Sequence, residues 1–110
     1  MTTPAEAAGF EQVEMAMAHV NKKHQDAIAR CLSRAEAGDP EAQFELGLRF
    51  ASGSGGRLDY VAAHKWFNLA AMRGVRKAID ERSELSREMT PAEIAAAQRA
   101  AREWLGARPH

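Results

Sequence analysis

The segment between residues 38 and 74 carries glycines and alanines at regular places, and this pattern constrains the fold more than any other feature. Asp39 precedes a proline and Asp59 precedes a second helix-forming run, so both aspartates suit helix N-cap positions. Gly53 and Gly74 stand where the C-terminus of a helix favours a residue that accepts positive φ. The segment therefore predicts two short helices joined by a glycine-containing loop.

The rest of the chain also predicts helices, because strand-like alternation is absent and alanine, glutamate, arginine and leucine dominate. The sequence from Thr90 to Glu93 is typical of a capping box, with Met89 and Ile94 at the positions of a hydrophobic staple. The same tetrapeptide begins at Thr3. We predict helices over residues 4–36, 40–52, 60–73, 75–88 and 91–106.

Small residues mark the expected contact between the helices 40–52 and 60–73. Gly47 lies in mid-helix, where glycine costs about 1 kcal/mol relative to alanine. Its presence indicates that another backbone approaches closely at this point. Two stripes at helical spacing would form the contact, and they consist of Ala42, Leu46 and Phe50 on the first helix and Ala63, Trp66, Phe67, Ala70 and Ala71 on the second.

At these positions the segment resembles a Sel-one-like repeat, a relative of the tetratricopeptide repeats. The residues in register with the family pattern are Ala42, Gln43, Leu46, Gly47, Phe50, Gly53, Gly55, Asp59, Ala63, Trp66, Phe67, Ala70, Ala71 and Gly74. Phe50 and Phe67 replace tyrosines of that pattern, and Gly56 replaces a loop valine. The resemblance implies an all-α fold, a short right-handed α-solenoid of stacked antiparallel helix pairs with a long N-terminal helix and a C-terminal capping helix.

The pattern covers about a third of the chain, and degenerate copies flank it at the same period. We therefore predict a single domain over residues 1–110, in which the terminal units act as caps. Its parts are an N-terminal helix or degenerate repeat at 1–37, the intact repeat at 38–74, and a degenerate repeat with the cap at 75–110. Residues 90–104 are similar to the tail of small bacterial family members, which implies a bacterial source.

The N-terminal segment has a heptad-like pattern with two interpretations. Phe10, Val13, Met17 and Val20 are three or four residues apart, as in the seam of a coiled coil, and Cys31 continues the stripe. Such a seam would dimerise the protein. Alternatively, one long helix packs this stripe on the repeat, and we favour packing because His24 and Ala27 weaken the seam.

Composition argues against several classes of function. Acidic and basic residues number 15 each, so the net charge of zero predicts neither a nucleic-acid nor an anionic-membrane partner. A single cysteine, no signal peptide and no long apolar run predict a cytoplasmic protein without membrane insertion. The histidines lack metal-ligand spacing, Cys31 lacks a neighbouring base, and the loop after Gly53 lacks the residues of a P-loop. We expect no enzymatic activity, metal or cofactor.

A protein-binding surface is the functional class that remains. Phe44, Glu45, Leu48 and Arg49 lie on the face of helix 40–52 away from Trp66. Apolar neighbours flanked by charge are typical of a groove for a helix or peptide, unless the N-terminal helix already covers them. We predict a non-catalytic adaptor or scaffold with a protein partner that the sequence does not identify. The alternative is a self-associating structural or regulatory subunit, a homodimer formed through Phe10, Val13, Met17 and Val20.

A double substitution, Val13→Asp with Val20→Asp, separates the two interpretations of the N-terminal stripe. We expect this variant to lose thermal stability, because charges would enter an intramolecular contact. Circular dichroism and light scattering measure the outcome. A variant that stays fully folded and changes from dimer to monomer would show that the stripe is intermolecular.

Overall fold

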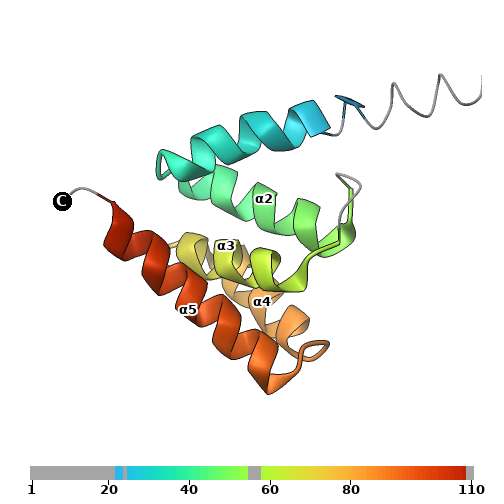
Figure 1. Cartoon of the computed structure of the whole chain (residues 1–110), viewed down its shortest axis with the longest axis vertical. Coiled ribbons are helices and arrows are strands. Elements are labelled where there is room, and N and C mark those ends of the chain that lie inside the picture. Colours follow the sequence, from blue (N-terminus) through green and yellow to red (C-terminus); the bar gives the residue numbers. More distant parts are fainter. Residues whose placement is uncertain (1–21, 24, 55–57, 109–110) are drawn as a thin grey trace, which may run out of the picture.

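The computed structural model describes residues 22–23, 25–54 and 58–108 of the chain (Figure 1). The regular elements in these ranges are all α-helices, which confirms the all-α prediction. A helical segment at 25–36 precedes α2 (Pro40–Ser52), α3 (Tyr60–Met72), α4 (Arg76–Ser86) and α5 (Pro91–Ala107). The bounds of α2 to α5 lie within two residues of the predicted ones. The expected helix start at Thr3 lies outside the described residues.

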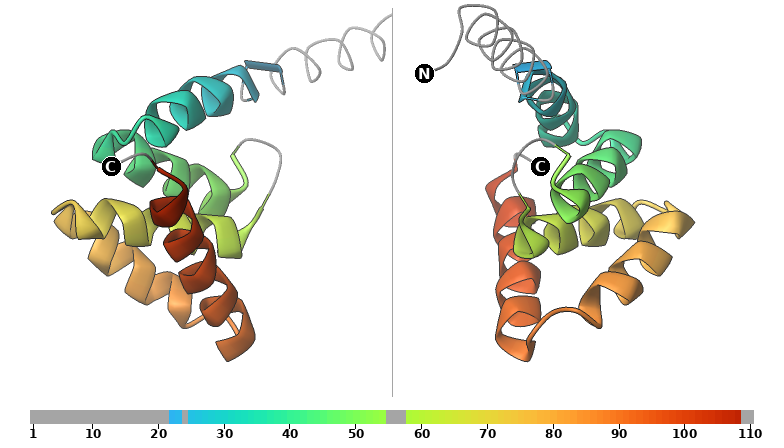
Figure 2. Two further views of the ribbon diagram at one scale, coloured as in Figure 1. Left: turned by 60° about the vertical axis from the view of Figure 1, so that its left-hand side comes forward. Right: turned by 90° about the vertical axis from the view of Figure 1, so that its right-hand side faces the viewer.

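Helix α3 is the centre of the arrangement. It packs against α2, α4 and α5, and consecutive helices run in opposite directions (Figures 1 and 2). The segment 25–36 lies on the side of α2 opposite α4 (Figure 2). Each helix after α2 therefore takes its position from α3.

The predicted caps form, and they explain where the helices begin and end. The side chain of Asp39 accepts hydrogen bonds from the amides of Glu41 and Ala42, and that of Asp59 accepts one from Ala62. Thr90 makes both bonds of a capping box with Glu93. Glycines at positive φ follow the helices before them, namely Gly38 (φ 100°), Gly53 (φ 71°) and Gly74 (φ 96°).

Two apolar clusters lie on different sides of α3. The first joins segment 25–36, α2, α3 and α5 through Cys31, Ala35, Ala42, Leu46, Trp66, Leu69 and Ala101. The second joins α3, α4 and α5 through Ala63, Phe67, Ala70, Ala78, Leu85, Met89 and Ala97. Phe50 packs against both clusters. Adjacent aromatic residues of α3, Trp66 and Phe67, therefore serve different cores.

The close approach at Gly47 involves an aromatic ring. A Cβ atom at this position would lie 2.5 Å from both Cδ1 and Cε1 of Phe67. The expectation of a second backbone at this point was therefore wrong. The ring of Phe67 fills the space that a side chain at position 47 would need.

The end of α5 is fastened to the end of segment 25–36. The rings of Trp66 and Trp104 meet edge to face at 5.8 Å, and Trp104 Nε1 donates a hydrogen bond to Glu36 at 2.7 Å. The guanidinium of Arg108 lies over the Trp104 ring at 4.4 Å and donates to the carbonyls of Glu36 and Ala37. These contacts join the C-terminal end of α5 to the turn that precedes α2.

Substitution of Gly47 tests the ring contact. We expect Gly47→Ala to destabilise the protein by about 2 kcal/mol, because overpacking of about 3 kcal/mol outweighs a propensity gain of about 1 kcal/mol. Urea denaturation followed by circular dichroism measures the change. Gly106→Ala is the matched control, since nothing lies within 4 Å of its Cβ position, and it should stabilise the protein. An equal cost of Gly47→Ala in a Phe67→Leu background would contradict the explanation.

Candidate functional site

The structure separates the four residues that the sequence analysis grouped as a partner-binding surface. Phe44 is half-buried and its ring lies 5.9 Å from that of Phe67, toward α3. Leu48, one turn later, is 38 % exposed. Glu45 and Arg49 point toward segment 25–36 instead. A single groove formed by all four residues therefore stays a prediction, because Glu45 and Phe44 contact different parts of the structure.

Glu45 and Arg49 form a small polar cluster with Cys31. Arg49 donates to Glu45 at 3.1 Å, and the Cys31 thiol donates to the Ala42 carbonyl at 3.1 Å with a longer contact of 3.6 Å to Glu45. Burial, together with the negative charge of Glu45, raises the pKa of Cys31 to about 11. The thiol is therefore protonated at neutral pH, where it is a poor nucleophile.

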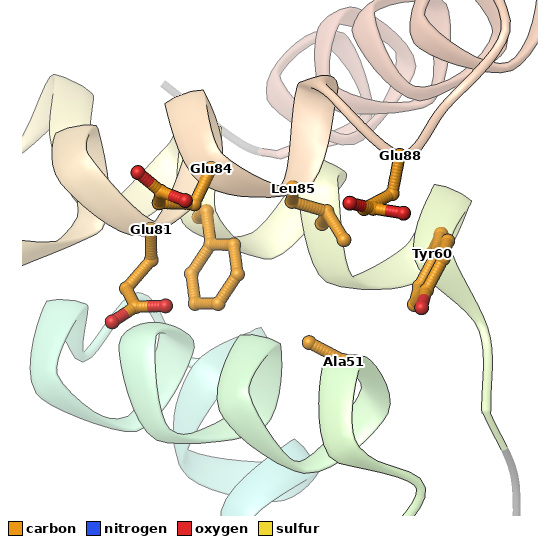
Figure 3. Close-up of a pocket in the computed structure, with 7 residues that line it drawn as sticks. Ala51, Tyr60, Glu81, Glu84, Leu85 and Glu88 are labelled. Atoms are coloured by element: carbon orange, nitrogen blue, oxygen red, sulfur yellow. The ribbon is translucent and has the colours of Figure 1, made fainter.

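A groove between α2 and α4, with residues of α3 at its base, contains two hollows. We call it the α2–α4 groove. One hollow of about 250 Å³ is lined by Ala51, Tyr60, Phe67, Glu81, Glu84, Leu85 and Glu88 (Figure 3). A second of about 360 Å³ is lined by Glu41, Phe44, Gly74, Val75, Arg76 and Lys77. Phe67 lines the first hollow and Phe44 the second, and their ring centroids lie 5.9 Å apart.

Helix α4 supplies the acidic wall of this groove. Figure 3 shows Glu81 and Glu88 on either side of Leu85, with Ala51 of α2 facing them. These residues were absent from the predicted site because 75–110 was interpreted as a degenerate repeat and cap. The spacing of Glu81 and Glu84 by three residues indicated one charged helix face, and Glu88 follows in the turn after α4.

Polar side chains position α4 against α3. Ser86 donates its hydroxyl proton to the Arg82 carbonyl and is 3.1 Å from His64 Nε2, so the network places the imidazole proton on Nε2. Arg82 also donates to the Asn68 side chain at 2.6 Å. His64 is 3 % exposed, and burial, with the nearby charge of Arg82, lowers its pKa. The groove wall therefore depends on a neutral histidine.

Three further predictions concern residues or features outside this groove. The proposed seam of Phe10, Val13, Met17 and Val20 lies outside the described residues. Within the described ranges, the structure has no group of three potential metal ligands close enough to hold an ion. No helix among these same residues is long and apolar enough to cross a membrane.

Comparison with known proteins gives no match, either to a protein-family model or to a curated protein sequence.

The buried histidine predicts a pH-dependent stability. The pKa of His64 is lower in the folded protein than its ordinary 6.5. The neutral, buried imidazole therefore contributes fully to the free energy of unfolding above pH 6.5, and this stabilisation is lost as the pH falls below 6.5. We expect the melting temperature of the wild type to fall more steeply between pH 8 and pH 5 than that of His64→Gln. The glutamine retains an amide donor for Ser86 but does not titrate. Identical pH profiles would contradict this role for His64.

Proposed function

We propose that this protein is a non-catalytic interaction module that binds a helix or extended peptide of a partner protein in the α2–α4 groove. The observation that carries the proposal is the run of partly exposed apolar and aromatic side chains along α2 and α3. Its members are Phe44, Leu48, Ala51 and Tyr60. Grooves with apolar anchors and a charged rim are the usual receptors of amphipathic segments.

The order of the helices supports the proposal. In our interpretation α2 with α3, and α4 with α5, are successive antiparallel pairs of a short right-handed solenoid of the Sel-one-like type. The first helices of both pairs, α2 and α4, would then line one concave face, which is where the two hollows lie. The repeat at 38–74 would supply the floor and one wall, and the degenerate unit after residue 75 the other wall.

The proposed module acts as an adaptor in the cytoplasm, and its affinity should be moderate. Burying one leucine- or phenylalanine-sized side chain contributes about 1.5–3 kcal/mol. Two or three such anchors contribute about 3–9 kcal/mol before the cost of ordering a peptide is subtracted, so dissociation constants should be weaker than about 1 μM. This range suits a reversible scaffold contact more than a permanent subunit interface.

Site-specific photo-crosslinking tests the proposal. Leu48, beside the groove, and Leu105, on α5, are 38 % and 37 % exposed, so they form a matched pair of positions. We expect benzoyl-phenylalanine at position 48 to give a discrete crosslinked protein in cells that express the chain, identifiable by mass spectrometry. The same group at position 105 should give none.

Two results would contradict the proposal. Equal crosslinking from both positions would indicate nonspecific contact with exposed apolar groups. Absence of any protein crosslink at position 48, with both variants folded by circular dichroism, would remove the groove as the binding surface.

A further inference from the structure

The α2–α4 groove is acidic at one end, where three glutamates line the first hollow. Glu81, Glu84 and Glu88 are exposed. Glu84 has a distant, largely solvated ion pair with Arg87 at 3.6 Å. Among the described residues, Glu81 and Glu88 have no ion-pair partner. Two carboxylates at the lip of a hollow with a mixed polar and apolar lining are therefore available to a ligand.

The opposite end of the groove has a different charge. Arg76 and Lys77 line the second hollow together with Glu41. Helix α4 begins at Arg76 and ends at Ser86, so its dipole adds positive potential beside the basic pair and negative potential beside Glu84 and Glu88. The side chains and the helix dipole thus both make the groove more positive near the N-terminus of α4 and more negative near its C-terminus.

The chain's own N-terminal segment has the wrong charge for the acidic end. Residues 1–20 contain Glu6, Glu11 and Glu14 but neither lysine nor arginine. Placing this segment beside Glu81 and Glu88 would bring like charges together, which disfavours the contact. The charges therefore select a ligand other than this segment.

We propose that the groove binds a basic amphipathic segment of another protein. Apolar side chains of that segment pack on the partly exposed Phe44, Ala51 and Tyr60, while lysine or arginine side chains pair with Glu81 and Glu88. The basic residues lie at the end of the ligand next to the C-terminus of α4. This inference rests on the proposed function and adds the chemistry and orientation of the partner.

Selection from a displayed library of random 16-residue peptides tests this chemistry without knowledge of the partner. The full-length wild type is the bait, and the test variant is Glu81→Gln/Glu88→Gln. The control variant, Asp26→Asn/Glu103→Gln, changes net charge equally at exposed positions outside the groove. Circular dichroism checks that all three proteins fold alike.

We expect the wild type and the control to enrich peptides that combine apolar residues with lysine or arginine toward one end. Fluorescence anisotropy with the enriched peptides should show about three- to tenfold weaker binding to the test variant, as expected for two exposed charge pairs. Added salt should weaken binding to the wild type more than binding to the test variant.

The possible failures are distinguishable. Enriched peptides without basic residues, or equal affinity for the wild type and the test variant, would overturn the inference and leave the proposed function standing. Absence of any enriched peptide would count against both. Salt-sensitive self-association of the wild type in sedimentation, abolished in the test variant, would overturn the inference by assigning the acidic end to a second copy of the chain.

Discussion

The contact between the Phe67 ring and the bare backbone of Gly47 determines how closely α3 lies to α2, and the other described helices depend on that distance. The ring occupies the volume that any side chain at position 47 would take. In doing so it joins the second apolar cluster, contacts Phe44 and forms part of the groove lining. The contact of Phe67 with Gly47 therefore sets the spacing of a helix pair and shapes the proposed binding surface.

Helix α3 can lie at the centre of the fold because its two apolar sides belong to different apolar clusters. Trp66 faces the cluster shared with segment 25–36 and α5, whereas Phe67 faces the cluster shared with α4 and α5. The bonds of Trp104 and Arg108 to the end of segment 25–36 then close the arrangement over long sequence separations. An edge-to-face aromatic pair and buried apolar area contribute more to such closure than exposed ion pairs do.

The acidic wall of the groove depends on how α4 packs against α3. Its acidic side chains become a wall only because α3 returns the chain beside α2, and the contacts of His64 with Ser86 and of Arg82 with Asn68 set the face that α4 presents. Because burial lowers the pKa of His64, protonation of its imidazole at acid pH is expected to weaken the packing of α4 on α3. Stability and binding are therefore linked through α3 and α4.

The sequence by itself determined the all-α class, the positions of α2 to α5 and the caps at Asp39, Asp59 and Thr90. These features depend on neighbouring residues and on backbone φ, so the local sequence predicts them. Only the tertiary structure decided which helix faces meet. It turned Glu45 toward segment 25–36 while its neighbour Phe44 faced α3, since successive helical residues point about 100° apart. It also made the acidic face of α4 part of a groove, because contacts between distant segments follow from shape and packing that no local pattern contains.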